Sequence, residues 1–301
     1  MLNSQNRGYW TTAAGEVLRR PRGYISLGVI IIYFCVAFWG LSGWHLPDWK
    51  TVDFSNSYQP PNAAHWFGTD IYGRDVLAKT VYGTRVALSV ALIASTLAVL
   101  IGVTLGMLAG FFGGVIDDLI SWLYSTLQTI PYILLILAFT FILQDRVFKI
   151  GGWVFRIRGI SAVYLALGLT GWVGLCRLIR GEVLKHRGRD YVLAARALGA
   201  SPARIMLKHL VPNIFHVVII TFSLGFVSYI HAEVILSFLG LGVRNTPSWG
   251  VMIDDAKLEL ARGVWWQLAA ATGAIFVISL ALHIFADTLR DALDPRLKGK
   301  K

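Results

Sequence analysis

Six long apolar runs constrain this chain more than any other feature of its sequence. A membrane-spanning α-helix needs about 20 apolar residues, because each residue adds about 1.5 Å and the hydrocarbon core is about 30 Å thick. The first run is too long for a signal-peptide core, and no small-residue cleavage site follows it, so it is predicted to be a retained span. We therefore predict six transmembrane helices, at residues 25–44, 86–112, 119–143, 160–176, 214–239 and 264–285.

Composition agrees with a polytopic membrane protein. Of the 301 residues, 55% are hydrophobic and 15% are charged, and the mean hydropathy is +0.60, which is more apolar than an average soluble domain. The net charge of +11 comes from basic residues in loops beside apolar runs, a pattern that favours lipid headgroups over nucleic acid as the partner. Cys35 and Cys176 lie inside apolar runs, where we expect small buried side chains and neither a disulfide nor a metal site.

Charge bias predicts the orientation of the spans. Loops on the side of the two termini hold 17 Lys or Arg and the opposite loops hold 10, so both termini are expected in the cytoplasm. Loop 144–159 runs against this bias, because it is external by alternation and carries four basic residues. The predicted organisation is a cytoplasmic interfacial segment at 1–24, the first span at 25–44, an external loop at 45–84, a five-helix core at 85–286 that contains loop 177–213, and a cytoplasmic tail at 287–301.

Loop 177–213 is the one long polar stretch between membrane-length runs, and it reads as two short helices. The first is predicted at 190–198, and Gly199 suits a left-handed residue just after its end. Ser201 and Pro202 supply an N-cap and a proline at the first position of a second helix, which runs to about residue 210 until Pro212 closes it. Eight basic residues against two acids place this loop in the cytoplasm, as a surface for another protein.

This loop resembles the EAA loop that marks the membrane subunits of bacterial ABC importers. The resemblance rests on the spacing of Ala194, Ala195, Gly199 and Pro212, and the longer string DYVLAARALGAS, which begins at Asp190 and includes Arg196, is similar to the dipeptide and oligopeptide permease branch. The glutamate of the general motif falls on Leu193, whereas Asp190 supplies the acid that the peptide branch carries three positions earlier.

Three further blocks are similar to the same branch, so the resemblance covers nearly the whole chain. They are the GTDxxGRD motif (Gly68, Thr69, Asp70, Gly73, Arg74 and Asp75), the run from Glu233 through the PSWG string at 247–250, and LRDALDPRLK in the tail. By residue chemistry alone, Asp70 and Asp75 around Arg74 could form a catalytic carboxylate pair. Because neither a nucleophile nor a histidine base is apparent beside them, we prefer a structural cap in which Arg74 satisfies carboxylates near the membrane interface.

The resemblance implies a fold and a set of partners. The fold is all-α, with six transmembrane helices in the type I importer permease arrangement and a cytoplasmic coupling loop. The implied partners are a second permease subunit, two ATP-binding subunits and an external substrate-binding protein, in a bacterial inner membrane. The sequence contains no GxxxxGK[ST] motif, so ATP and Mg are expected on the partner ATPases and no cofactor on this chain.

Three residues in the apolar runs are candidates for the translocation pathway. Glu233 and His231 are a titratable pair well inside the fifth run, and intramembrane ionisable groups are often functional. Pro131 lies in the middle of the third run, where it frees a backbone carbonyl. A simple kink is an equally good interpretation of Pro131. Packing is an equally good interpretation of Glu233, and the better one for a lone histidine such as His231.

Two other classes of protein were weighed against the importer permease. An intramembrane protease is disfavoured because the chain has neither HExxH nor GxSxG. A stand-alone secondary transporter is disfavoured because no internal repeat with paired broken helices is apparent. Substrate choice stays open among dipeptides, longer peptides, nickel chelates and some sugars, all handled by members of the family that the chain resembles.

Overall fold

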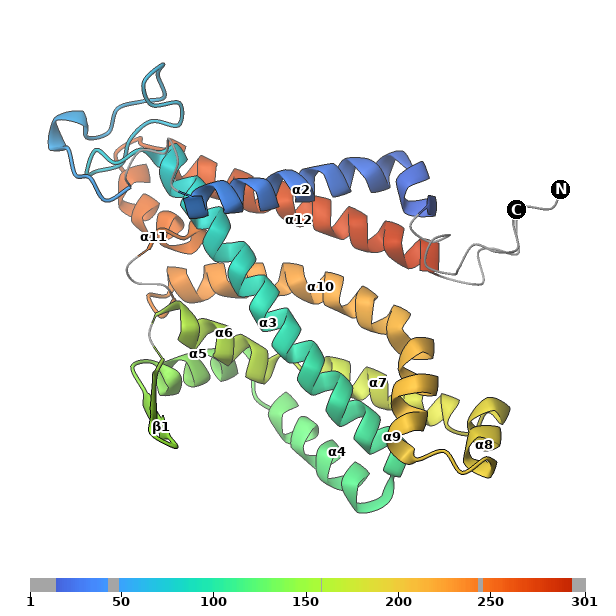
Figure 1. Cartoon of the computed structure of the whole chain (residues 1–301). Helices are drawn as coiled ribbons and strands as arrows, with labels where there is room; N and C mark the ends of the chain where they lie inside the picture. The colour runs from blue at the N-terminus through green and yellow to red at the C-terminus, as the bar shows by residue number, and fades with distance from the viewer. Residues whose placement is uncertain (1–14, 43–48, 158, 243–245, 294–301) are drawn as a thin grey trace. The chain divides into compact units, whose positions relative to one another are not determined.

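The computed structural model describes residues 15–42, 49–157, 159–242 and 246–293 (Figure 1). The chain divides into two compact units, which are described separately. Unit 1 contains residues 1–89 and 233–301, and unit 2 contains residues 90–232. Because the boundaries at 89 and 232 fall inside long helices, α3 (Val76–Phe112) and α10 (Val211–Phe238) contribute to both units.

Unit 1 is built on a pair of long helices. In Figure 1, α2 (Pro21–Ser42) lies along α12 (Trp266–Leu293), and the Tyr33 hydroxyl donates to the Ala274 carbonyl at 2.9 Å. Helix α11 (Trp249–Leu260) packs on α12, and the 45–84 loop contains a single turn of 3-10 helix, η1 (Phe54–Asn56). Helix α11 was not predicted. It begins at Ser248, whose hydroxyl accepts from the Val251 N–H as an N-cap.

Unit 2 is a chain of shorter elements after α3. In order, they are α4 (Gly114–Gln128), α5 (Tyr132–Leu143), β1 (Val147–Ile150), β2 (Trp153–Arg156), α6 (Ile160–Thr170), α7 (Val173–His186), α8 (Asp190–Ala197), α9 (Pro202–Arg204), the π-helical turn η2 (Ile205–Leu210) and α10. The two strands form an antiparallel hairpin in which Phe148 pairs with Phe155. This hairpin and an isolated bridge between Thr69 and Asp75 are the β-structure in the part of the chain that the structure describes, and we predicted only loops at both places.

Glycines at a four-residue period bring α3 close to α7. A Cβ added at Gly106 would lie 2.9 Å from the Cβ of Ile179, and one added at Gly110 would lie 2.8 Å from the Cβ of Val183. Both distances are too short for two carbon atoms, so these positions need glycine. Small residues at this spacing line one helix face, so α7 can lie close against it.

The third apolar run is not one kinked helix, as predicted from 119–143. It is two helices, α4 and α5, bent by 98° at residues 129–131. Pro131 precedes α5 with an extended ψ of 126°, it has no N–H to donate, and a proline disfavours helical geometry in the residue before it. The described residues thus contain five helices long and apolar enough to span a membrane, or six if α4 and α5 are one broken span.

Pro212 does not end a helix. The predicted end of the second short helix in loop 177–213 was therefore wrong. The helix that starts at Pro202 continues through η2 into α10, and together they form a 37-residue candidate span. In the wider π turn before the proline, the Val211 N–H donates to the Met206 carbonyl five residues earlier, and the helix continues past the position where Pro212 has no N–H to donate. The Asn213 side chain donates to the His209 carbonyl at 2.7 Å and satisfies another exposed acceptor.

Several span boundaries also moved. Helix α3 starts at Val76 rather than at 86, because the Asp75 carboxylate accepts from the Ala78 N–H and caps it. Helix α12 extends to Leu293, into the predicted tail, and residues 294–301 lie outside the described chain. Most of the predicted N-terminal segment, residues 1–14, also lies outside it. Cys176 is buried as expected, but Cys35 is exposed on α2.

Candidate functional site

The turn after α8 has the geometry predicted for Gly199. This residue has a φ of +77°, its N–H donates to the Arg196 carbonyl, and the Ala200 N–H donates to the Ala195 carbonyl. These two bonds form a Schellman motif, which requires a left-handed residue at the position of Gly199. A Cβ added there would meet nothing within 4 Å, so the requirement for glycine comes from the backbone alone.

The start of the next helix also matches its sequence signature. Ser201 has an extended backbone, its hydroxyl accepts from the Arg204 N–H at 3.4 Å, and Pro202 occupies the first helical turn. Only one residue, Ala200, separates the left-handed turn from this cap. The angle between α8 and the helix that follows is therefore set by a very short, well-defined connection.

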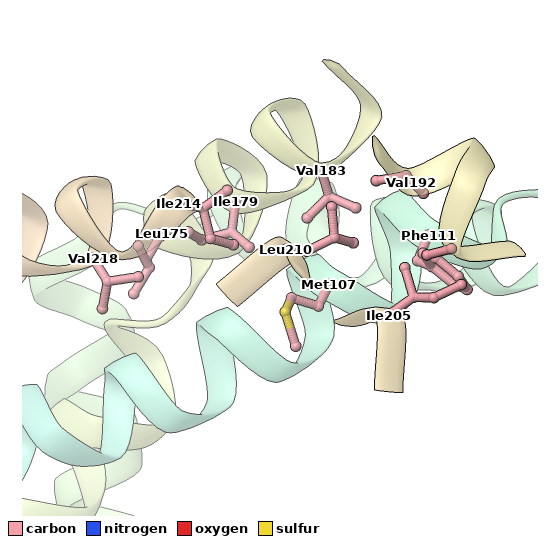
Figure 2. Close-up of a cluster of buried hydrophobic side chains, with 11 residues drawn as sticks. Met107, Phe111, Leu175, Ile179, Val183, Val192, Ile205, Leu210, Ile214 and Val218 are labelled. Carbon is pink, nitrogen blue, oxygen red and sulfur yellow. The ribbon is translucent and has the colours of Figure 1, made fainter. Parts of the chain in front are cut away.

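The inner side of α8 belongs to the apolar core of unit 2 (Figure 2). Val192 and Ala195 are buried there, beside side chains from α3, α7, η2 and the first half of α10. The other members of this cluster are Met107, Phe111, Leu175, Ile179, Val183, Ile205, Leu210, Ile214 and Val218. Helix α8 is thus packed against α3, α7 and α10, and densely packed side chains leave little free volume for it to move alone.

The outer side of α8 is open to solvent. Asp190, Ala194 and Arg196 are exposed, and so are Leu193 at 49% and Leu198 at 87%. The Arg196 guanidinium also lies 5.0 Å from the centre of the Phe111 ring, so it extends over the end of α3. A small surface that combines exposed leucines with basic groups is typical of a protein-docking site rather than of a solvated loop.

Sequence reasoning missed a set of contacts that support this loop. Arg180 on α7 makes two hydrogen bonds to the Asp117 carboxylate on α4, and Arg187 donates to the Gly110 carbonyl at the end of α3. In the sequence, these two basic residues counted only toward the charge bias that predicts a cytoplasmic loop. In the structure, they connect α7 to two neighbouring helices. A basic loop residue with an acid 63 positions away has no local sequence signature, so this pairing could not have been predicted.

The GTDxxGRD motif builds a compact polar centre in unit 1. The Asp70 carboxylate accepts from the backbone N–H groups of Tyr72 and Arg74, from the Arg74 side chain at 2.7 Å, and from Lys79 Nζ at 2.9 Å. Burial alone would raise the pKa of Asp70, but Lys79 and Arg74 outweigh it and hold that pKa below its ordinary value. The group is a buried anion with four donors.

The remaining motif residues shape the loop around this centre. Gly68 and Gly73 have φ of +71° and +69°, and a Cβ at Gly68 would lie 2.9 Å from an indole carbon of Trp266. The buried Thr69 offers its carbonyl to the Trp266 indole N–H at 2.8 Å. Asp75 does not pair with Arg74. It is held by His65 Nδ1 at 2.9 Å, a histidine contact that the sequence analysis missed.

Three further polar residues complete the centre and were not singled out from the sequence. Lys79 Nζ also donates to Gln267 Oε1 at 2.7 Å and approaches Asp255 at 3.4 Å. Glu259 accepts from the Ile71 N–H through one carboxylate oxygen, whereas its other oxygen is buried without a partner among the described residues. Burial raises the pKa of Glu259 above its ordinary value. Apart from this one Glu259 oxygen, the donors and acceptors named here hold the loop against α3, α11 and α12.

The three pathway candidates lie in different surroundings. Glu233 is fully buried in unit 1, where Ser237 donates to it at 2.6 Å and a Cβ at Gly250 would press on Ser237 at 2.6 Å. His231, in unit 2, is exposed on α10. Pro131 lines a pocket of about 460 Å³ in unit 2. The structure therefore does not bring these three residues together into one site.

The pocket beside Pro131 has an uncharged lining that is largely apolar and includes several hydroxyl groups and glycines. Tyr132 and Thr170 face it from α5 and α6, and Tyr229 faces it from α10. Gly171 permits the approach of Tyr229, because any added Cβ would collide with the tyrosine ring, 2.8 Å away at Cζ. A half-open hollow with hydroxyl groups and no charged lining can contact a polar solute without holding it tightly.

These features define a polytopic helical membrane protein that presents a capped two-helix surface. Comparison with known families agrees with this class. The chain belongs to the family described as binding-protein-dependent transport system inner membrane component, which matches residues 102–299. It is a transport component, not an enzyme.

Relatives at moderate identity extend the match to the whole chain. The oligopeptide transport system permease protein OppC of Bacillus subtilis is 34% identical over 99% of this chain and 93% of its own length. The dipeptide transport system permease protein DppC of the same organism is 38% identical over 79% of this chain and 71% of its own length. The glutathione transport system permease protein GsiD of Shigella flexneri is 34% identical over 82% of this chain and 77% of its own length.

Proposed function

We propose that this chain forms half of the translocation pathway of an ATP-driven importer for peptides or related small solutes. The observation that carries the proposal is the two-sided α8, with an exposed docking face and a buried face inside the core of unit 2. The names of the relatives, which refer to dipeptide, oligopeptide and glutathione transport, support a peptide-like substrate.

The proposed mechanism starts at the outer face of α8. An ATPase subunit binds to Leu193, Leu198 and the basic groups around them, and Asp190 provides an acidic contact. Because Val192 and Ala195 are packed against α3, α7 and α10, a displacement of α8 moves these helices as a body. ATP and Mg bind to that partner. This chain contributes α8, which acts as the lever that transmits the motion, and half of the translocation pathway.

The rest of the assembly follows from the same proposal. A second permease completes the path, an external binding protein delivers the substrate, and both termini face the cytoplasm of a bacterial cell. Within this chain we assign the pocket beside Pro131 to the path, on the basis of its hydroxyl and glycine lining. His231 and Glu233 remain path candidates from the sequence, and the enclosed position of Glu233 favours packing.

The test is co-purification of the full-length chain from native membranes, with mass spectrometry of the proteins and small molecules that accompany it. We expect two ATPase polypeptides, one homologous permease and a peptide-class ligand. A chain that purifies intact and alone under conditions that preserve a known importer would contradict the proposal.

A further inference from the structure

A pocket of about 440 Å³ lies in unit 1 between the first residues of α2 and the last two turns of α12. Figure 1 shows these two helix ends side by side. Arg20 and Arg22 line it from the α2 side, and Asp287 and Asp291 line it from α12. None of these residues belongs to the loop or the polar centre described above, so the function proposed for the chain leaves them unexplained.

The floor of the pocket is tightly built. A Cβ at Gly23 would collide with the Val17 carbonyl oxygen and lie 3.1 Å from Thr288 Cγ2, so glycine lets this turn of α2 pack on Val17 and close to α12. Thr288 is only 6% exposed, and Val17 beneath the same turn is 5% exposed. The charged groups around the pocket are therefore carried by backbone segments that are fixed against one another, unlike the side chains of a loose surface loop.

The four charges form one closed pair and one open pair. Arg20 donates to Asp291 at 2.9 Å and so satisfies its partner. Arg22 and Asp287 are both exposed and line the same pocket, but they make no ion pair with each other in the part of the chain described. Within the described ranges, the pocket thus presents a cation and an anion that lie farther apart than an ion pair and have no other ion-pair partner.

The pocket also lies at the edge of the membrane. Both helices are candidate spans, and the apolar part of α2 begins directly after Arg22. Tyr24 and Ile25, the next exposed residues, are 52% and 56% exposed and offer an apolar surface for hydrocarbon. Charged groups within one turn of the hydrocarbon lie at headgroup depth.

We propose that this pocket binds the headgroup of phosphatidylethanolamine. The lipid phosphate lies against Arg22, with Arg20 beside it, the primary ammonium donates to Asp287, and the acyl chains follow Tyr24 and Ile25. Arg22 and Asp287 do not reach each other, but a headgroup that carries both a phosphate and an ammonium can bind both side chains at once. The ammonium has three N–H donors for the carboxylate, whereas the choline headgroup has none and phosphatidylglycerol has no cation.

The experiment is lipid competition on the full-length chain, purified with whatever subunits accompany it and examined by native mass spectrometry. Phosphatidylethanolamine, phosphatidylcholine and phosphatidylglycerol with identical acyl chains are added in equal amounts. We expect retained phosphatidylethanolamine to exceed each of the others by about three- to fivefold, the size expected of one partly exposed charged contact. Asp287→Asn should abolish this preference, and Arg22→Gln should lower binding of all three phospholipids.

Arg290→Gln is the matched control, because Arg290 is an exposed basic residue near the same end of α12 that does not line the pocket. It should bind like the unaltered chain. Equal retention of the three lipids by the unaltered chain would overturn the proposal. So would a preference for phosphatidylglycerol, which would reveal only a basic patch. The comparison among lipids on the unaltered chain decides the matter even if a variant fails to fold.

Discussion

Lys79 donates to Asp70 across 2.9 Å, and the two side chains are 2% and 1% exposed. Both ends of this buried pair are satisfied by additional partners, because Gln267 accepts a second Lys79 proton and two backbone N–H groups bind Asp70. A buried ion pair is tolerated only with such extra hydrogen bonds. The GTDxxGRD motif is thus attached to α3 by an ion pair, and Lys79 connects it further to α12 by a hydrogen bond to Gln267.

The first prediction concerns this pair. Lys79→Met leaves the Asp70 carboxylate buried beside a single cation, so we expect the free energy of unfolding to fall by about 3–5 kcal/mol. Unfolding of the purified chain in detergent, followed by tryptophan fluorescence, measures it. Lys185→Met is the control, because Lys185 pairs with Glu182 at the surface, where such a pair contributes about 0–1 kcal/mol. If the two variants were equally stable, the buried contact between Lys79 and Asp70 would not stabilise the folded state as proposed.

The second prediction is a pH dependence that originates at Glu259. Its pKa is raised by burial, and Lys79, Asp70, Asp255 and the Ile71 N–H surround it. A raised carboxyl pKa means that the folded state holds the proton more tightly, so this contribution to stability is complete below the ordinary value of 4.5 and is lost as the pH rises through the raised pKa.

Glu259→Gln copies the protonated form at every pH. We expect the variant to lose this decline, so that its Tm exceeds that of the unaltered chain at pH 8 and matches it at pH 4. Thermal unfolding across that range measures the difference. A parallel pair of curves, offset by the same amount at both pH values, would show that Glu259 does not titrate between them.

Local signals in the sequence were sufficient for much of the structure. Gly199, Ser201 and Pro202 act within a few residues of their position, and each adopts the predicted geometry. The glycine period in α3 likewise predicts a close helix contact without naming its partner, which the structure identifies as α7. Hydropathy placed the spans because burial in lipid depends on composition more than on neighbours.

Signals that depend on distant residues were missed or misread. Pro212 looked like a helix end, but a π turn and the Asn213 side chain compensate for it. Pro131 was predicted to lie within one helix, but its ψ of 126° and the N–H that it lacks make it a break between α4 and α5. Lys79 lies in the segment predicted as an external loop, and nothing near it in the sequence indicates its contacts with Asp70 and Gln267, so the polar centre became apparent only from the fold.

The third prediction tests the side of the β-hairpin. Alternation of spans makes it external, although its basic residues argue against this. Val154 is 63% exposed and has no special backbone angle, so Val154→Cys, in a chain with the exposed Cys35 changed to Ala, should react with a membrane-impermeant thiol reagent added to intact spheroplasts. Labelling only after the membrane is opened would reverse the predicted orientation of this segment.

The fourth prediction concerns Gly199 and the lever. Gly199→Val places a β-branched residue at a φ of +77°, which costs more than the roughly 1 kcal/mol of an ordinary side chain. Since an added Cβ meets nothing within 4 Å, the whole effect acts on the turn that orients α8, and the spans keep their burial. We expect a chain that inserts normally but recruits its ATPases poorly, or allows them to hydrolyse ATP without transport.

Two substitutions separate backbone strain from the addition of bulk in this fourth case. Gly188→Val adds the same side chain in the same loop, at a glycine with open space and no positive φ, and should leave coupling intact. Gly199→Asn keeps a residue that tolerates the left-handed region and should restore most of the activity. The measurements are ATPase binding and substrate-stimulated hydrolysis in reconstituted complexes. If Gly199→Val docks its ATPases and transports as well as Gly188→Val, then the Schellman turn does not set the lever, and the coupling role proposed for this loop fails with it.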